Sequence, residues 1–212
     1  MAEQFPESEE FVRLRETILS CQRCSLRQSA HGVVFGEGDS RNPQLVFIGE
    51  GPGAEEDRLL RPFVGPAGQL LDKMLHAAGF ERFHGVYILN VVKCRPPHNR
   101  TPTVDERRAC WPHLTSQLRY LSPRIVVLLG ATAVQTLLGI SSLSAARGRW
   151  HERGGVFFLA TYHPAALLRN PAWKTEAWAD MKMVVDKYRE YVNPHHDSPF
   201  YPLADERSDE PG

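Results

Sequence analysis

Four unbroken apolar runs are the clearest secondary-structure signal along the chain. They cover residues 44–49, 86–92, 125–130 and 156–162. Runs of Val, Ile, Leu and Phe of this length are typical of strands that are covered on both faces of a sheet. We therefore predict four buried strands.

Amphipathic stretches between these runs predict helices. Residues 67–79 place their apolar side chains on one helical face and end in glycine. Thr103 and Glu106 match a capping box, which predicts a helix that continues to about Leu121. Further helices are expected over residues 9–20, with Ser8 as the cap, and over 131–139 and 174–191. Alternating strands and helices predict an α/β fold with a mostly parallel sheet flanked by helices, whose ligand site lies at the carboxyl ends of the strands.

Charge is distributed unevenly along the chain. The 212 residues include 25 basic and 25 acidic side chains, so the formal net charge is zero. Residues 11–193 hold 24 basic and 16 acidic residues, a net charge of +8, and both ends are acidic. A basic body is compatible with a nucleic-acid partner. Residues 194–212 contain four prolines and few apolar residues, so we expect a domain over 1–193 and a disordered acidic tail over 194–212.

The sequence carries no sign of a membrane or secretory segment. No run approaches the roughly 18 apolar residues of a membrane span, and residues 1–10 are acidic without an apolar stretch. We therefore expect a cytoplasmic protein with no membrane partner. We also expect a monomer. Cysteines in that compartment are more often metal ligands or core residues than disulfides.

A glycine-rich loop follows the first predicted strand, in the stretch LVFIGEGPGAEED at residues 45–57. Gly49, Gly51 and Ala54 fit the G-x-G-x-x-G/A pattern of a dinucleotide-binding turn. Against that interpretation, the loop carries several carboxylates that would repel a pyrophosphate, and Pro52 removes one N–H donor.

Carboxylates at a strand end suit a different task, which is to activate a water or to stabilise a developing cation. Glu50 follows the strand directly and is the best placed of them. Glu55, Glu56 and Asp57 are equally well explained as acids that complement the dipole of a starting helix. Glu56 and Asp57 nevertheless lie close enough in sequence to share the work of Glu50.

The four cysteines are Cys21, Cys24, Cys94 and Cys110. The first two form a C-x2-C pair, and all four lie in polar or basic surroundings rather than in an apolar periodicity. One interpretation is that they fill the core. The alternative is one four-thiolate site with a structural role, and the spacing suits either zinc or a [4Fe–4S] cluster.

Three more side chains lie at or beside predicted strand ends. Phe63 lies in a loop flanked by glycines and is either ordinary packing or a platform for a flat ligand. Asn90 ends the second strand, where its amide can offer one acceptor and two donors to a base edge, or fix a turn. His163 follows the fourth strand as a candidate acid or electrostatic partner.

The segment after His163 combines apolar and basic residues. Leu167 and Leu168 are expected on an exposed loop, with Arg169 beside them. Apolar side chains next to a basic residue are a means by which proteins unstack a nucleic-acid duplex.

Taken together and in this order, these segments resemble the type 4, iron–sulfur-containing uracil-DNA glycosylases. The resemblance covers about residues 15–190 and is carried by GEGPGAEED with RPFVGPAGQLL, by NVVKCRPPHNRTP, by the cysteine spacing and by YHPAALLRNP. It implies a single-domain α/β fold with a central four-stranded sheet. It also implies hydrolysis of the N-glycosidic bond of deoxyuridine in single- or double-stranded DNA, which leaves an abasic site for base excision repair.

The resemblance also implies residue roles. Glu50 would position or activate the attacking water, and Gly51 would give the base and sugar room. Phe63 would stack on the uracil, Asn90 would pair with its polar edge, and His163 would stabilise charge near its O2 atom. The remaining implied residues are the [4Fe–4S] ligands Cys21, Cys24, Cys94 and Cys110 and the DNA-binding residues Leu167, Leu168 and Arg169.

Two departures from the family pattern bear on the chemistry. Family members often carry a third acid where this chain has Ala54, which leaves Glu50 untouched. A related branch that crosslinks to uracil-DNA has a longer basic loop ending in a nucleophilic histidine, whereas this chain has the short PPHNRTP with His98. We therefore expect a monofunctional enzyme that turns over. The alternatives are a crosslinking relative, a non-catalytic iron–sulfur protein that binds nucleic acid, and a zinc-containing nucleotide-binding protein.

Overall fold

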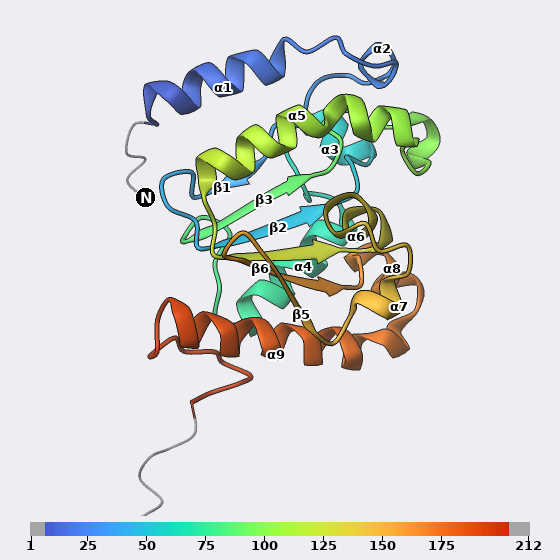
Figure 1. Ribbon diagram of the computed structural model, residues 1–212. Helices are drawn as coiled ribbons and strands as arrows, with labels where there is room; N and C mark the ends of the chain where they lie inside the picture. Colours follow the sequence, from blue (N-terminus) through green and yellow to red (C-terminus); the bar gives the residue numbers. More distant parts are fainter. Residues whose placement is uncertain (1–6, 204–212) are drawn as a thin grey trace, which may run out of the picture.

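The computed structural model describes residues 7–203, and within that range one sheet of six strands runs through the molecule (Figure 1). The strand order is β1-β3-β2-β4-β6-β5. The strands are β1 (Glu37–Gly38), β2 (Leu45–Gly49), β3 (Val86–Asn90), β4 (Ile125–Leu129), β5 (Trp150–Arg153) and β6 (Val156–Thr161). The four predicted strands are confirmed as the parallel centre, but the sheet is larger than the four strands that we expected.

The two additional strands are short, antiparallel and at the edges. β1 pairs with β3 over two residues, and β5 forms a hairpin with β6. Edge strands of this kind lack a continuous apolar run, because β5 reads WHER and only half of it is partly buried. Gly154 and Gly155 both have positive φ and connect β5 to β6, which is the glycine pair that tight hairpin turns favour.

The register of the central strands brings their carboxyl ends to one edge. Gly49 of β2 lies opposite Asn90 of β3, and Leu129 of β4 lies opposite Thr161 of β6. The residues that follow each strand therefore meet at the same edge, as expected for a parallel α/β sheet.

Helices cover both faces of the sheet (Figure 1). One face packs against α1 (Glu9–Leu19), α2 (Leu26–Ser29), α5 (Val104–Leu121), α6 (Ala131–Leu138) and α7 (Leu143–Ala146). The opposite face packs against α4 (Pro66–Ala77) and α9 (Lys174–Tyr191). The short helices α3 (Ala54–Leu59) and α8 (Pro164–Arg169) and the 3-10 turns Pro97–Asn99 and Pro171–Trp173 lie in the connections.

Alternate residues of the strands face these two layers, as β2 illustrates. Val46 and Ile48 contribute to the core under α1 and α5, whereas Leu45 and Phe47 contribute to the core above α4 and α9. All five residues of β2 are buried, which is why its sequence shows no alternation of polar and apolar residues.

The predicted helix starts are confirmed where a capping side chain was recognised. The Ser8 hydroxyl accepts from the Phe11 N–H and opens α1. Thr103 and Glu106 form the expected reciprocal capping box at the start of α5. No helix within residues 7–203 is both long enough and apolar enough to cross a bilayer.

The segment that we expected to begin a disordered tail makes contacts with the domain at His196, Ser198 and Tyr201. The His196 ring stacks on Phe80 with ring centroids 4.4 Å apart, and the Ser198 hydroxyl donates to the Ala77 carbonyl at 3.0 Å. The boundary at residue 193 is therefore too early, because aromatic stacking and buried hydroxyls do not appear in a composition count. The remainder of the predicted tail, residues 204–212, lies outside the described residues.

Candidate active site

A cleft of about 810 Å³ opens at the edge where the central strands end. It is lined by segments that follow β2, β3, β4 and β6, so it occupies the position expected for a ligand site in a parallel α/β sheet. The structure brings six of the predicted site residues to this one cleft, namely Glu50, Gly51, Phe63, Asn90, His163 and Arg169.

Phe63 and His163 form one aromatic wall of the cleft. Their ring centroids lie 5.4 Å apart and the ring planes are inclined by 28°, so the two rings stack. The Phe63 backbone has a φ of 51°, in the left-handed region that a bulky residue rarely adopts. The surrounding contacts must therefore hold this turn in place.

Asn90 lies beside this wall and is 2% exposed. A Cβ atom at Gly49 would lie 2.5 Å from both the Asn90 Oδ1 atom and the Phe63 ring. The absence of a side chain at Gly49 is therefore what allows the amide and the ring to approach one another. Asn90 Oδ1 is buried and has no hydrogen-bond partner in the described structure. A buried acceptor without a donor is costly, so this atom is ready for a donor on a ligand.

His163 is held in one orientation at the start of α8. Its Nδ1 atom accepts a hydrogen bond from the Ala165 N–H at 3.2 Å, so a neutral ring carries its proton on Nε2. Burial, reinforced by the charge of Arg169, lowers the pKa of His163 to about 4. The ring is therefore neutral near pH 7, and its Nε2–H can donate to a ligand.

The side chain of Thr132, in the helix that follows β4, orients Glu50, which follows β2. The Thr132 hydroxyl donates to Glu50 Oε2, and the Val92 N–H donates to the Glu50 carbonyl at 3.1 Å. Thr132 is 7% exposed and belongs to the first turn of α6. Sequence reasoning missed this residue, although a polar side chain two positions after the Gly130 strand end was a usable signal.

The two acids that could share the work of Glu50 both accept from main-chain N–H groups, although Glu56 also lines the cleft. Glu56 accepts from the N–H groups of Val64 and Gly65 at 2.9 and 2.8 Å. Asp57 is buried and accepts from the His31 N–H at 3.0 Å. Both carboxylates thus fix neighbouring loops, whereas Glu50 lines the cleft and accepts from the Thr132 hydroxyl.

The three residues predicted to enter a duplex do not share one environment. Leu168 is 45% exposed and Arg169 lines the cleft, in agreement with a surface role. Leu167, in contrast, is 1% exposed. The expectation of an exposed loop is wrong for this residue, because the segment folds as α8 and turns Leu167 toward the core.

The four cysteines lie around the same small cavity. Cys21, Cys24, Cys94 and Cys110 line one small cavity between the segment after α1, the loop after β3 and α5. Burial, with the neighbouring thiol of Cys110, raises the pKa of Cys94 to about 12. No group of three or more His, Cys, Asp or Glu side chains within residues 7–203 is arranged to hold one metal ion.

Two side chains with nitrogen atoms, His113 and Lys93, line this cavity beside the thiols. The His113 Nε2 atom is buried and has no partner among the described residues. Lys93 is 2% exposed, and its Nζ donates to the Asn90 carbonyl at 2.9 Å. Buried cations are normally paired with a negative charge, and no carboxylate within residues 7–203 pairs with Lys93. A thiolate-bound iron–sulfur cluster would supply that charge, so the residues present fit such a group.

Comparison with known proteins identifies the family of this chain. The family model for the uracil DNA glycosylase superfamily matches residues 35–182. The chain belongs to the uracil DNA glycosylase superfamily. It is 44% identical to a type-4 uracil-DNA glycosylase of Thermotoga maritima, over 73% of this chain and 81% of the relative. A type-4 uracil-DNA glycosylase of Pyrobaculum aerophilum is 42% identical over 81% of this chain and 91% of the relative. A type-5 uracil-DNA glycosylase of Thermus thermophilus is 34% identical over 61% of this chain and 66% of the relative.

Proposed function

We propose that this protein is a monofunctional uracil-DNA glycosylase of base excision repair that contains a [4Fe–4S] cluster. The observation that carries the proposal is the buried, unpartnered Asn90 Oδ1 beside the Phe63 ring. A flat base seated on Phe63 can satisfy that acceptor with one ring N–H. Family membership and the type-4 relatives support the same conclusion.

Recognition of uracil follows from the oxygen and the NH2 group of the Asn90 amide. Its oxygen accepts from the uracil N3–H, and its NH2 group donates to uracil O4. Cytosine has no proton at N3 and carries an amino group in place of O4, so both contacts would be lost. A site built to pair with a polar group rejects an analogue that leaves its buried atoms unpaired. The base reaches this position only after the nucleotide is flipped out of the duplex, which costs a few kcal/mol.

Hydrolysis develops charge on the sugar and on the uracil, and side chains of the cleft can stabilise both charges. As the glycosidic bond lengthens, the sugar gains cationic character and the uracil gains negative charge. The neutral His163 donates through Nε2 to uracil O2 and stabilises the departing base. Glu50, held by Thr132, positions the attacking water and stabilises the sugar cation.

The cluster would be held by Cys21, Cys24, Cys94 and Cys110, and it would join the segment after α1 to the loop after β3 and to α5. A single zinc ion requires four sulfurs about 3.8 Å apart, given Zn–S bonds of about 2.3 Å. The ligands of a four-iron cluster bind different irons and lie farther apart. Four thiols around one cavity and the type-4 relatives support the cluster.

The experiment uses oligonucleotides that carry one uracil, cytosine or thymine at the same position. The protein is incubated with each, and heating in alkali reveals abasic sites. We expect cleavage only at uracil, with no covalent protein–DNA band on a denaturing gel, because His98 is exposed and does not line the cleft. Absence of cleavage would overturn the proposal, and a covalent band would indicate the crosslinking alternative.

Iron and acid-labile sulfide are measured on the same preparation. We expect about four of each per chain for one [4Fe–4S] cluster. One zinc per chain, without sulfide, would overturn the cofactor proposal and leave the glycosylase proposal standing. We also propose that the protein works as a monomer in the cytoplasm, and light scattering of the purified protein tests the first of these statements.

A further inference from the structure

The Phe63 turn needs support from outside the cleft. Its φ of 51° is unfavourable for a bulky residue, and such conformations persist only where the surroundings determine them. Phe63 is also 4% exposed and lies against His163, so a small change of its backbone would change the face that it offers to a base. The residues that fix this turn therefore influence the site without touching a substrate.

Arg82 lies in the connection between α4 and β3, and its side chain contacts the main chain of the Phe63 turn. Its guanidinium donates through Nη1 to the Pro62 carbonyl at 3.0 Å and through Nη2 to the Phe63 carbonyl at 2.8 Å. The Arg82 side chain is 10% exposed. Two parallel donors in one rigid plane fix the orientation of two successive peptide groups, which a single point charge cannot do.

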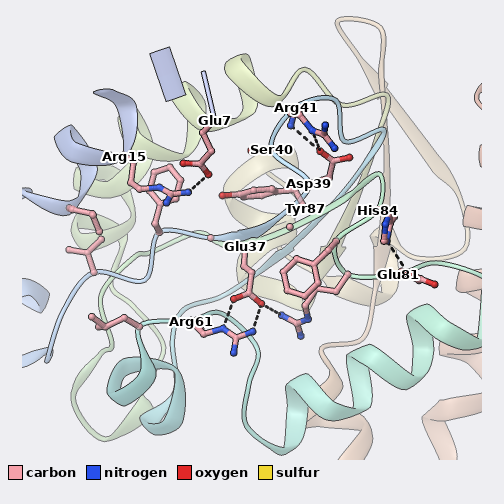
Figure 2. Close-up of a pocket in the computed structure, with 18 residues that line it drawn as sticks. Glu7, Arg15, Glu37, Asp39, Ser40, Arg41, Arg61, Glu81, His84 and Tyr87 are labelled. Atoms are coloured by element: carbon pink, nitrogen blue, oxygen red, sulfur yellow. Dashed lines mark hydrogen bonds and ion pairs between the residues drawn. The ribbon is translucent and has the colours of Figure 1, made fainter. Parts of the chain in front are cut away.

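Two carboxylates hold the guanidinium itself. Glu37 of β1 pairs with Arg82 Nη1 at 3.2 Å, and Asp72 of α4 pairs with Arg82 Nη2 at 2.8 Å. Glu37 also pairs with Arg61 on the wall of a cavity of about 1180 Å³ at the β1 edge of the sheet, which Arg82 lines as well (Figure 2). Arg82 thus lies between this edge cavity and the Phe63 turn.

The opposite side of the turn is fixed by other residues. Glu56 accepts from the N–H groups of Val64 and Gly65. A Cβ atom at Gly68 would lie 1.8 Å from the Phe63 carbonyl oxygen, so that oxygen lies directly against the α4 backbone. Arg82 supplies the donors for the carbonyls of the turn, and Glu56 supplies the acceptor for its N–H groups.

We propose that Arg82 is a positioning residue that sets the base-stacking face of Phe63, an inference that rests on the proposed function. Without the guanidinium, the carbonyls of Pro62 and Phe63 lose their donors and the Phe63 backbone relaxes from its left-handed conformation. The ring then turns from its place over His163 and beside Asn90. Stacking on the flipped uracil weakens, whereas the Glu50 and His163 groups that act on the bond remain in place.

The test compares steady-state uracil excision by the wild type and by Arg82→Met. Stacking of a base on an aromatic ring forms on binding, so its loss raises KM more than it lowers kcat. From the usual strength of such stacking we expect KM to rise about tenfold. We expect kcat to change by less than about threefold. Arg82→Lys keeps the charge but cannot donate to both carbonyls in one plane, so it should restore only part of the loss.

Two matched variants separate positioning from general stability. Arg61→Met removes the other partner of Glu37 but no contact with the turn. Arg189→Met removes an arginine that is 13% exposed and that also donates to two main-chain carbonyls, those of His196 and Tyr201, away from the cleft. Both controls should keep the wild-type KM even where their melting temperatures fall.

The outcomes distinguish this inference from the proposed function. An inactive wild type would overturn the proposed function and this inference with it. An active wild type with an unchanged KM in Arg82→Met would overturn the inference alone. If Arg82→Met does not fold, Arg82→Lys decides, because a KM equal to that of the wild type would contradict the need for two donors. An equal rise of KM in Arg189→Met would assign the effect to stability and overturn the positioning role.

Discussion

Replacing Thr132 by valine removes the hydroxyl that donates to Glu50 while keeping the shape of the side chain. Thr132 is 7% exposed, so water cannot take its place freely, and Glu50 would lose the hydroxyl that donates to it. A hydrogen bond to a charged group contributes roughly 1.5–3 kcal/mol. If that orientation is needed in the transition state, single-turnover uracil excision should slow about 10- to 100-fold.

The assay uses enzyme in excess over a labelled uracil oligonucleotide, so that it reports the chemical step rather than product release. The control is Thr136→Val, one turn further along α6, whose hydroxyl donates to the Thr132 carbonyl at 2.7 Å and does not reach Glu50. A rate for Thr132→Val within twofold of the wild type would show that the Thr132 hydroxyl does not orient Glu50 for the chemical step. So would an equal loss in Thr136→Val, because the effect would then belong to the helix and not to the carboxylate.

Three further outcomes follow from the structure. Phe63→Ala should weaken binding of uracil-DNA by roughly 1–3 kcal/mol, measured as Kd with a catalytically slowed enzyme. The pKa of His163 is about 4 when folded against 6.5 when unfolded, so the unfolded chain gains protons first as the pH falls. This group should therefore cost about 3 kcal/mol of stability between pH 6.5 and 4, and urea titrations of His163→Gln should lack that loss. Cys94→Ser should lower the iron content and the melting temperature together, measured by metal analysis and calorimetry.

The parts of the fold that could be predicted from sequence are those with a strong local signal. Continuous burial makes the central strands recognisable, and α1 and α5 begin at side chains that cap their first N–H groups. The edge strands β1 and β5 could not be recognised in this way, because half-exposed residues carry no apolar run. The packing of His196 on Phe80 also has no local signal, since the two residues are far apart in the chain.

Some residues of the candidate site could likewise be predicted from the sequence, and others could not. Glu50, Asn90 and His163 could be placed at one edge because each lies at or just after the end of a strand, and the resemblance to a family added their roles. Thr132 and Arg82 could not, because their importance lies in which atoms they reach after folding. Helical side chains of adjacent residues point in different directions, and for that reason the exposed Leu168 and the buried Leu167 differ.

The proposed recognition of uracil requires that the Asn90 oxygen accepts from the N3–H of a flipped uracil. Single-turnover excision of uracil by the wild type and by Asn90→Ala, at equal cluster content, tests this requirement directly. We predict that the wild type releases free uracil and that Asn90→Ala is slower by at least about 100-fold, because two contacts to the base are lost at once. Release of uracil by Asn90→Ala at the wild-type rate would contradict the account.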